Sequence, residues 1–392
     1  MKKKIFKIAV ALICVLVAYG IFQNFNYEDA EKINAYFSSF AFDEDFDASN
    51  QPYSMHNYNE LSAVEKQAYI CIFNNIASHP DYIKIPNLTS EEFNRVYFAV
   101  KNDNPNMLCF NESCSMLEFF NSCLIQLSYE HNSDECKSMQ TQLMQTVRFI
   151  VDEMPEFNDD YSKELYIHDY IVQNCVYKES QSASTAYSCL IDGFAVCSGY
   201  SRATMLLLNE AGIDSMLIAG TGESSSQGAV SHMWNLVWIE GEPYHLDVTW
   251  DDPVTESTDV ISHLYFNLTD TEISADHSDY KVFYECTART YNYFVNNNLS
   301  FDLYGQNVLD TIKLKLANNI NNGRYYIEFT FDNDDAYKTA QSRLIDDTST
   351  HSDIYDLLDY ISRYAADKVD KTHINFACDD NKNYIRMMFD IL

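Results

Sequence analysis

A turn leads directly into a helix at Asp192-Gly193-Phe194-Ala195-Val196-Cys197-Ser198-Gly199-Tyr200, and a cysteine stands at the junction. The apolar residues that follow share one helical face, and Gly212 is a typical C-terminal stop. Unpaired N–H groups at a helix N-terminus stabilise a thiolate and lower the pKa of the thiol. This context favours Cys197 as a nucleophile over the alternative interpretation, a buried structural cysteine or a disulfide partner.

A thiol nucleophile needs a base, and His232 is the candidate. Strand-like segments at Met233–Ile239 and Tyr244–Trp250 can form a hairpin that Glu240-Gly241 closes as a two-residue turn. In that register His232 faces Thr249 and lies diagonal to Asp247 on the same face of the sheet. Asp247 can then orient the imidazole and stabilise its cation.

The assignment of Asp247 depends on this turn, because a three-residue turn would place its side chain on the opposite face. The alternative interpretations are a packed histidine at position 232 and a capping or solvated acid at position 247.

Three blocks of sequence occur in the same order as in a known family. They are residues 192–200, His232-Met233-Trp234-Asn235, and Tyr244-His245-Leu246-Asp247-Val248-Thr249-Trp250-Asp251-Asp252-Pro253. Together they resemble the core domain of the transglutaminase-like superfamily, which contains transglutaminases, peptide N-glycanases and bacterial cysteine-peptidase-like proteins. The resemblance covers about residues 160–270.

The resemblance implies an α+β fold with a papain-like transglutaminase core, in which a nucleophile helix packs on an antiparallel sheet. It assigns Cys197 as nucleophile, His232 as base and Asp247 as orienting acid. Together with the basic and apolar N-terminal leader, the resemblance implies an extracytoplasmic bacterial enzyme of the cell envelope that acts on proteins or peptides.

Other residues near these blocks have less specific signals. The backbone N–H of Cys197 should form one arm of an oxyanion hole, and Tyr187 is a candidate for the second arm or a packing residue. Trp234 and Trp250 are expected as core or cleft-wall aromatics. Cys189 stands where the family commonly has a small apolar residue, which raises the hypothesis of an inhibitory disulfide with Cys197.

The chain as a whole divides into five expected segments. These are a signal peptide or membrane anchor (1–22), a tether (23–55), a mostly helical domain (56–155), the catalytic core (156–300) and a small α/β module (301–392). In the helical domain, capping boxes at Ser62–Glu65 and Thr89–Glu92 start two helices, and strand-like runs occur near 107–110 and 124–129. In the last module we expect strand 325–331, helices 335–344 and 353–369, and strand 385–391.

The N-terminus carries a basic leader, Met1-Lys2-Lys3-Lys4, and an apolar run over 8–22. The run is shorter than the roughly 20 residues of a membrane-spanning helix, and Ala18-Tyr19-Gly20 offers a small-x-small cleavage site. The leader therefore predicts a secreted protein, with an uncleaved membrane tether through residues 5–22 as the alternative.

Composition narrows the classes of partner. The 392 residues include 58 acidic and 26 basic ones, for a formal net charge of -32, which disfavours nucleic acid and anionic lipid as partners.

The cysteines allow disulfides but indicate no metal site. Cys109, Cys114, Cys123 and Cys136 form a cluster that allows one or two disulfides, in three possible connectivities. Because no Cys-x-x-Cys or His-Glu-x-x-His motif occurs, we expect neither a metal nor another cofactor.

The sequence thus predicts a Cys197–His232–Asp247 thiol enzyme acting on amide bonds through an acyl-thioester. Water as acceptor gives a peptidase or amidase and a primary amine gives transamidation, and hydrolysis is slightly favoured because an exposed site needs shielding to prefer amines. The alternatives from other classes are a catalytically inactive surface-binding module and a redox-responsive surface protein.

Overall fold

The computed structural model describes residues 42–48, 50–119, 122–180, 182–224, 228–252, 260–346, 352–365 and 369–391. The expected leader over 1–22 and the first part of the expected tether lie outside these residues. The chain divides into two compact units, one holding residues 60–100 and 111–129 and the other holding 52–59, 101–110 and 130–392. In the described part of the chain, no helix combines the length and the apolar character needed to cross a membrane.

The first unit combines helices with a three-stranded sheet. Helix α4 (Ala63–Ile76) begins at the capping box of Ser62 and Glu65, and α5 (Ser90–Asp103) begins where Thr89 and Glu92 bond each other reciprocally, so both expected helix starts are confirmed. The sheet has the order β1-β3-β2, from Ile83–Ile85, Ser122–Tyr129 and Phe110–Phe119. The run near 124–129 is therefore a strand as expected, whereas the other strand begins at Phe110, where the run near 107–110 ends.

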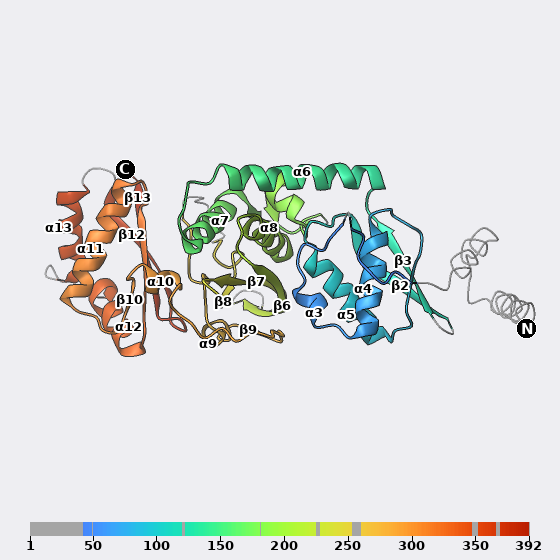
Figure 1. The fold of residues 1–392 in the computed structure, drawn as a ribbon. Coiled ribbons are helices and arrows are strands. Elements are labelled where there is room, and N and C mark those ends of the chain that lie inside the picture. Colours follow the sequence, from blue (N-terminus) through green and yellow to red (C-terminus); the bar gives the residue numbers. More distant parts are fainter. Residues whose placement is uncertain are drawn as a thin grey trace, which may run out of the picture. The chain divides into compact units, whose positions relative to one another are not determined.

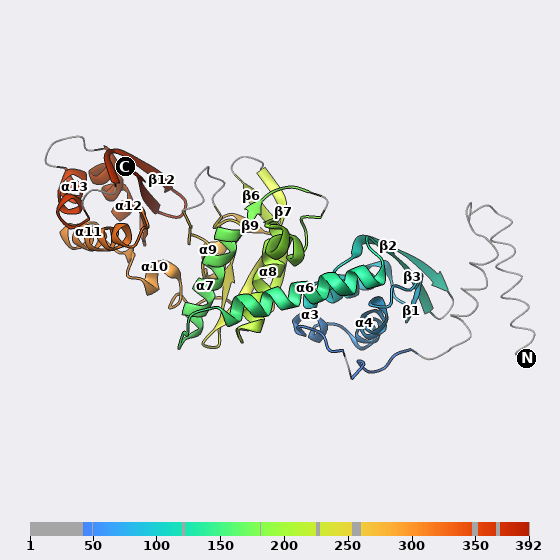
Figure 2. The same ribbon diagram turned by 90° about the horizontal axis from the view of Figure 1, so that it is seen from above.

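The second unit is built around an antiparallel sheet of order β8-β7-β6-β9 (Figure 1). Its strands are β6 (Ser215–Ser224), β7 (Gly228–Ile239), β8 (Glu242–Leu246) and β9 (His277–Ser278). Helix α8 (Cys197–Glu210) packs on β6 and β7, and α7 (Asp160–Asn174) and α6 (Ser133–Asp152) pack on α8 (Figure 2). The buried apolar residues of these helices form one core with residues of β7 and β8. Met216 and Ile218 of β6 belong to a second cluster, together with Trp234 and Leu236 of β7. This arrangement confirms the expected α+β fold, with the nucleophile helix on an antiparallel sheet.

The hairpin that connects β7 to β8 has the expected register. Ile239 pairs with Glu242 and Asn235 pairs with Leu246, so Glu240 and Gly241 form a two-residue turn. Both turn residues have positive φ, 52° and 85°, as the favoured hairpin turn requires. Strand β8 ends at Leu246, however, so the strand expected over Tyr244–Trp250 is too long and Thr249 does not pair with His232.

The C-terminal residues of the second unit form a mixed sheet of order β10-β11-β13-β12 with three α-helices. The elements are β10 (Ser300–Phe301), α11 (Gln306–Asn321), β11 (Tyr326–Phe331), α12 (Asp334–Gln341), α13 (Asp353–Tyr364), β12 (Val369–Asp379) and β13 (Tyr384–Ile391). The expected helix over 353–369 ends at Tyr364, and Val369 instead starts an edge strand. Helix α11 was not expected, although its buried Leu309, Ile312, Leu316 and Ile320 repeat at helical spacing.

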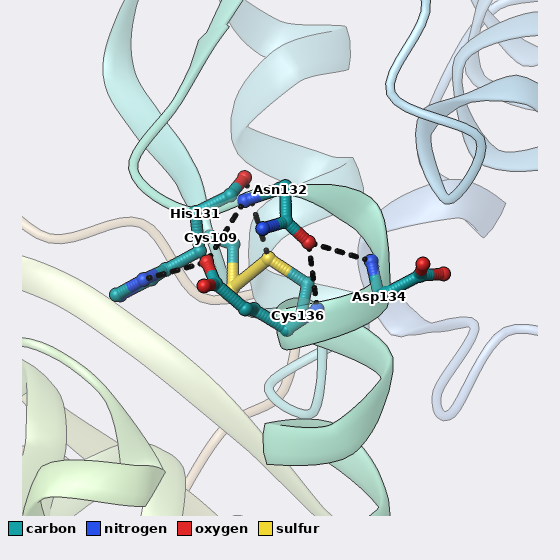
Figure 3. The surroundings of a disulfide bond; sticks show 6 residues. Cys109, His131, Asn132, Asp134 and Cys136 are labelled. Carbon is teal, nitrogen blue, oxygen red and sulfur yellow. Dashed lines mark hydrogen bonds and ion pairs between the residues drawn. A yellow bond between two sulfur atoms is a disulfide. The ribbon is translucent and has the colours of Figure 1, made fainter.

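One disulfide, Cys109–Cys136, joins the chain before β2 to helix α6 (Figure 3). The two cysteines are 27 residues apart in sequence. Beside it, the Asn132 side chain accepts hydrogen bonds from the backbone N–H groups of Asp134 and Glu135 and so caps α6. Of the four clustered cysteines, Cys109 and Cys136 are therefore the pair that the structure joins, which agrees with one of the three connectivities that the sequence left open.

A buried ionic cluster connects the C-terminal sheet to helix α7. His263 Nε2 lies 2.9 Å from Asp169 Oδ1, and His263 Nδ1 bonds Glu328 of β11. Burial alone would lower the pKa of His263, but the charges of Asp169 and Glu328 outweigh it and raise the pKa to about 10. The cluster therefore holds His263 as a cation at neutral pH.

We predict that removing the disulfide by replacing Cys109 and Cys136 with serine lowers the free energy of unfolding by about 3 kcal/mol. The reason is the restored freedom of the unfolded loop between them. Urea denaturation followed by circular dichroism measures the change. Replacing the exposed Cys378 with serine is the control and should leave the midpoint where it is. Equal midpoints for all three proteins would contradict this account.

We predict that the stability gained from His263 depends on pH. Its folded pKa lies above the unfolded value of about 6.5, so the contribution is complete below pH 6.5 and is lost as pH rises to about 10. In that window the unfolding free energy of the wild type should fall relative to that of His263→Gln by about 1.4 kcal/mol per pH unit. Parallel pH profiles for the two proteins would show that His263 is neutral in the fold.

Candidate active site

Cys197 is the first residue of α8, where the chain leaves an extended segment. Gly193 takes a positive φ of 76°, and Val196 is extended and acts as the N-cap. At Gly199 a Cβ would come within 2.6 Å of the Ala183 carbonyl oxygen and 2.7 Å of the Ala195 Cβ, so only glycine allows the helix start to pack this closely. The Cys197 side chain is half-buried, which leaves it accessible at the N-terminus of a helix.

His232 on β7 interacts with both Cys197 and Asp247. Its Nε2 lies 2.6 Å from Asp247 Oδ2, so Nδ1 is the ring nitrogen left for Cys197. Burial lowers the pKa of His232, but the charge and hydrogen bond of Asp247, and then those of Cys197, raise it to about 10. An imidazole held this way stays protonated at neutral pH and stabilises a neighbouring thiolate.

Asp247 accepts hydrogen bonds from four donors although it is completely buried. Its Oδ1 accepts from the backbone N–H groups of Thr249 and Trp250 at 3.0 and 3.2 Å. Its Oδ2 accepts from His232 and, at 3.1 Å, from His277 Nε2. Burial alone would raise the pKa of Asp247, but the two histidines hold it well below its usual value. The acid therefore stays ionised and fixes the orientation of His232.

The two predicted aromatic residues surround this pair. The Trp234 ring is fully buried and lies 5.9 Å from the His232 ring, so Trp234 belongs to the core. The half-buried Trp250 lies 5.1 Å from the His232 ring. At Gly222 of β6 a Cβ would come within 2.7 Å of the Trp250 ring, so this glycine makes room for the indole.

Tyr187 has a different partner from the one that an oxyanion role requires. Its hydroxyl donates to Gln142 Oε1 on α6 at 2.8 Å, and its ring packs against the core of the second unit. These contacts fit its interpretation as a packing residue.

The sequence analysis did not identify Tyr177 as a neighbour of Cys197. Its phenol is partly exposed and lies close enough to Cys197 for the charge of that residue to act on it.

Tyr177 belongs to the two-residue strand β4 (Val176–Tyr177), which pairs with β5 (Phe194–Ala195) just before Cys197. Burial, followed by the charge of Cys197, raises the pKa of Tyr177. A parallel pairing this short has no hydrophobic alternation that could reveal it in the sequence.

Cys189 also has a different neighbour from the expected one. Its thiol is buried and interacts with Cys175, the residue that ends α7. Burial and this neighbour raise the pKa of the Cys189 thiol well above its usual value, which keeps it protonated. The structure thus places Cys189 beside Cys175, while the hypothesis of a disulfide between Cys189 and Cys197 stays a prediction.

Three groups of side chains in the described residues have metal-ligand chemistry, two made of histidines and acids and the third of His245, Asp270 and Cys286. The histidines and acids of all three are hydrogen-bonded to one another. One is the His232–Asp247–His277 group itself. In another, both ring nitrogens of His168 and of His263 face carboxylates. In the third, the Trp234 indole N–H donates to His245 Nδ1, so neutral His245 carries its proton on Nε2 and donates it to Asp270. A metal at that nitrogen would have to displace this proton.

Comparison with known proteins is consistent with this geometry. Residues 150–248 match the family model of the transglutaminase-like superfamily. No curated protein matches the chain. Similar solved structures include a Cytophaga hutchinsonii protein described as a cysteine protease (13% identity, TM-score 0.24), a TGase (13%, 0.25) and Legionella pneumophila LapG (13%, 0.22).

The matched parts are 35%, 44% and 40% of this chain and 61%, 52% and 78% of those chains, respectively. The chain spans less than two thirds of the length of the first of these structures, and the family match covers residues 150–248. That segment contains Cys197, His232 and Asp247 together with the helix and strands that position them. Residues 150–248 of this chain are therefore a transglutaminase-like domain.

Proposed function

We propose that this protein is a thiol enzyme that cleaves amide bonds of proteins or peptides through an acyl-thioester on Cys197. The observation that carries the proposal is the position of His232, which interacts with Cys197 on one side and bonds ionised Asp247 at 2.6 Å on the other. A half-buried thiol at a helix N-terminus, a cationic imidazole and a buried carboxylate are the parts that nucleophilic thiol catalysis needs.

The reaction follows from these positions. The Cys197 thiolate attacks the amide carbonyl carbon, and a C–S bond forms while the carbonyl oxygen takes the negative charge. The N–H groups of the first turn of α8 stabilise that oxyanion. His232 then gives its proton to the amide nitrogen, the C–N bond breaks and the amine leaves. Asp247 stays ionised throughout and holds the imidazole in position.

The acceptor of the acyl group decides the net reaction. When water attacks the thioester, His232 takes the proton of the water, a carboxylic acid forms and the thiolate is restored. We favour this hydrolysis over transamidation because Cys197 is half-buried and water can reach it. The strongly acidic chain favours neutral or cationic substrates.

We place the enzyme outside the cytoplasm, either secreted or tethered through residues 5–22. Two features support this location. The basic leader and the apolar run over 8–22 have the pattern of a secretory signal. The Cys109–Cys136 disulfide is typical of proteins that fold in an oxidising compartment.

We predict that iodoacetamide alkylates Cys197 faster than the exposed Cys378 at pH 6, by roughly tenfold to a hundredfold, because the His232 cation interacts with the Cys197 side chain. His232→Ala should remove this advantage and leave Cys378 unchanged. Peptide mass spectrometry resolves the two sites in one sample. If Cys197 is as slow as Cys378 in the wild type, the domain is not a thiol enzyme and a binding role replaces this proposal.

We predict that a peptide mixture incubated with the enzyme gains new carboxyl termini or loses ammonia, and that Cys197→Ala abolishes both. Adding a primary amine such as cadaverine should leave most product masses at the values for hydrolysis, because water reaches the thioester first. Mass spectrometry separates the products. Predominant incorporation of the amine would overturn the preference for hydrolysis while leaving the thiol mechanism intact.

A further inference from the structure

His277 contacts the catalytic acid from outside the transglutaminase-like segment. It lies on β9, the two-residue strand at the edge of the sheet, where it pairs with Gly222 of β6. Its side chain is buried, and its ring lies 4.8 Å from the Trp234 ring and 4.4 Å from the Trp250 ring. A buried imidazole with aromatic rings on two sides has little room to turn, so its hydrogen bonds are fixed in direction.

Both ring nitrogens of His277 face carboxylates. Nε2 lies 3.1 Å from Asp247 Oδ2, and Nδ1 lies 2.7 Å from Asp276 Oδ1. An ionised carboxylate only accepts hydrogen bonds, so each nitrogen must donate, and an imidazole that donates twice is an imidazolium. Burial lowers the pKa of His277, but the two carboxylates outweigh it and raise the pKa above its usual value.

The acid behind His277 is itself paired. Asp276 Oδ2 accepts a hydrogen bond of 2.8 Å from the Tyr265 hydroxyl and lies 3.2 Å from Lys382 Nζ. Lys382 belongs to the turn between β12 and β13 of the C-terminal sheet. Charges of alternating sign therefore extend from His232 through Asp247, His277 and Asp276 to Lys382.

The other titratable neighbours of His277 do not break this alternation. His232 on β7 lies 5.3 Å away between ring centres and bonds the same Asp247 oxygen. His245 on β8 has its pKa lowered by burial and also by the charge of His277, and Trp234 fixes it in the neutral form. Tyr265 remains protonated because burial and Asp276 raise its pKa.

We infer that His277 is a positioning residue of the active site, which acts as a cationic clamp on Asp247 and is itself held by Asp276 and Lys382. The inference rests on the proposed function, because it concerns the acid that orients the catalytic base. His277 fixes the Asp247 oxygen that accepts from His232 and keeps that carboxylate ionised.

We expect removal of the clamp to act through the orientation of Asp247. Without His277, the Asp247 oxygen that accepts from His232 is less firmly held, so the hydrogen bond that stabilises the His232 cation is weakened. A less stable His232 cation raises the pH at which Cys197 becomes reactive.

The test measures the alkylation rate of Cys197 against pH in the full chain, for wild type, His277→Gln and His277→Ala. We expect the midpoint to rise by about one pH unit in His277→Ala, which is about a tenfold loss of rate below the midpoint. His277→Gln keeps a donor and loses the charge, so its midpoint should lie between the other two. Asp276→Asn should shift the midpoint in the same direction as His277→Gln.

His263→Gln is the matched control. His263 is also a buried histidine between two carboxylates, but its partners are Asp169 and Glu328 rather than Asp247. It should lose stability without any shift in the Cys197 midpoint, and thermal unfolding checks that all variants are folded at the assay temperature. A structural role alone for His277 predicts the same result as for His263.

The outcomes separate this inference from the proposed function. If wild-type Cys197 is activated by His232 and the His277 variants keep the wild-type midpoint, the clamp is wrong and the enzyme proposal stands. If wild-type Cys197 shows no activation, both are overturned. An upward shift with His277 and none with His263 supports the clamp.

Discussion

The buried carboxylate of Asp247 is the constraint on which the site depends. A carboxylate with no exposed surface remains ionised only when donors surround it, and here four groups from three parts of the chain supply them. The end of β8 supplies two backbone N–H groups, β7 supplies His232 and β9 supplies His277. The turn after Leu246 has to stop the strand so that both N–H groups can point at Oδ1. The early end of β8 is thus required by the backbone hydrogen bonds that Asp247 accepts.

This requirement explains which parts of the site could be predicted from the sequence. The hairpin register follows from the Glu240-Gly241 turn, and it correctly placed His232 near Asp247. The sequence could not show that Asp247 reaches His232 from a turn, because strand length depends on hydrogen bonds that close locally around the side chain. It could not reveal His277 either, which follows Asp247 by 30 residues and lies on a strand of two residues with no periodicity.

In the flanking elements, too, features set by neighbouring residues could be predicted, and features set by tertiary contacts could not. Capping boxes are local, and both predicted helix starts are confirmed at Ser62 and Thr89. The helix predicted through Val369 ends at Tyr364, and Val369 instead pairs with Ile391 of β13, a tertiary contact that overrides helical propensity. Helix α11 is an exception, because its apolar residues do repeat at helical spacing in the sequence. The sequence analysis did not predict it, since the surrounding residues are rich in asparagine.

Alternating histidines and acids are buried in two places in the second unit. Burying these charged groups costs solvation free energy that apolar residues would not lose. A buried ion pair is seldom more stabilising than apolar residues of the same volume, but removal of one partner is costly because a charge is left alone. Such clusters therefore specify a unique geometry. The His263 cluster fixes β11 against α7, and the His277 cluster fixes Asp276 beside Lys382, in the turn that follows β12. Because the His277 cluster includes Lys382, in the turn between β12 and β13, the C-terminal part of the chain contributes to the surroundings of Asp247 from outside the transglutaminase-like segment.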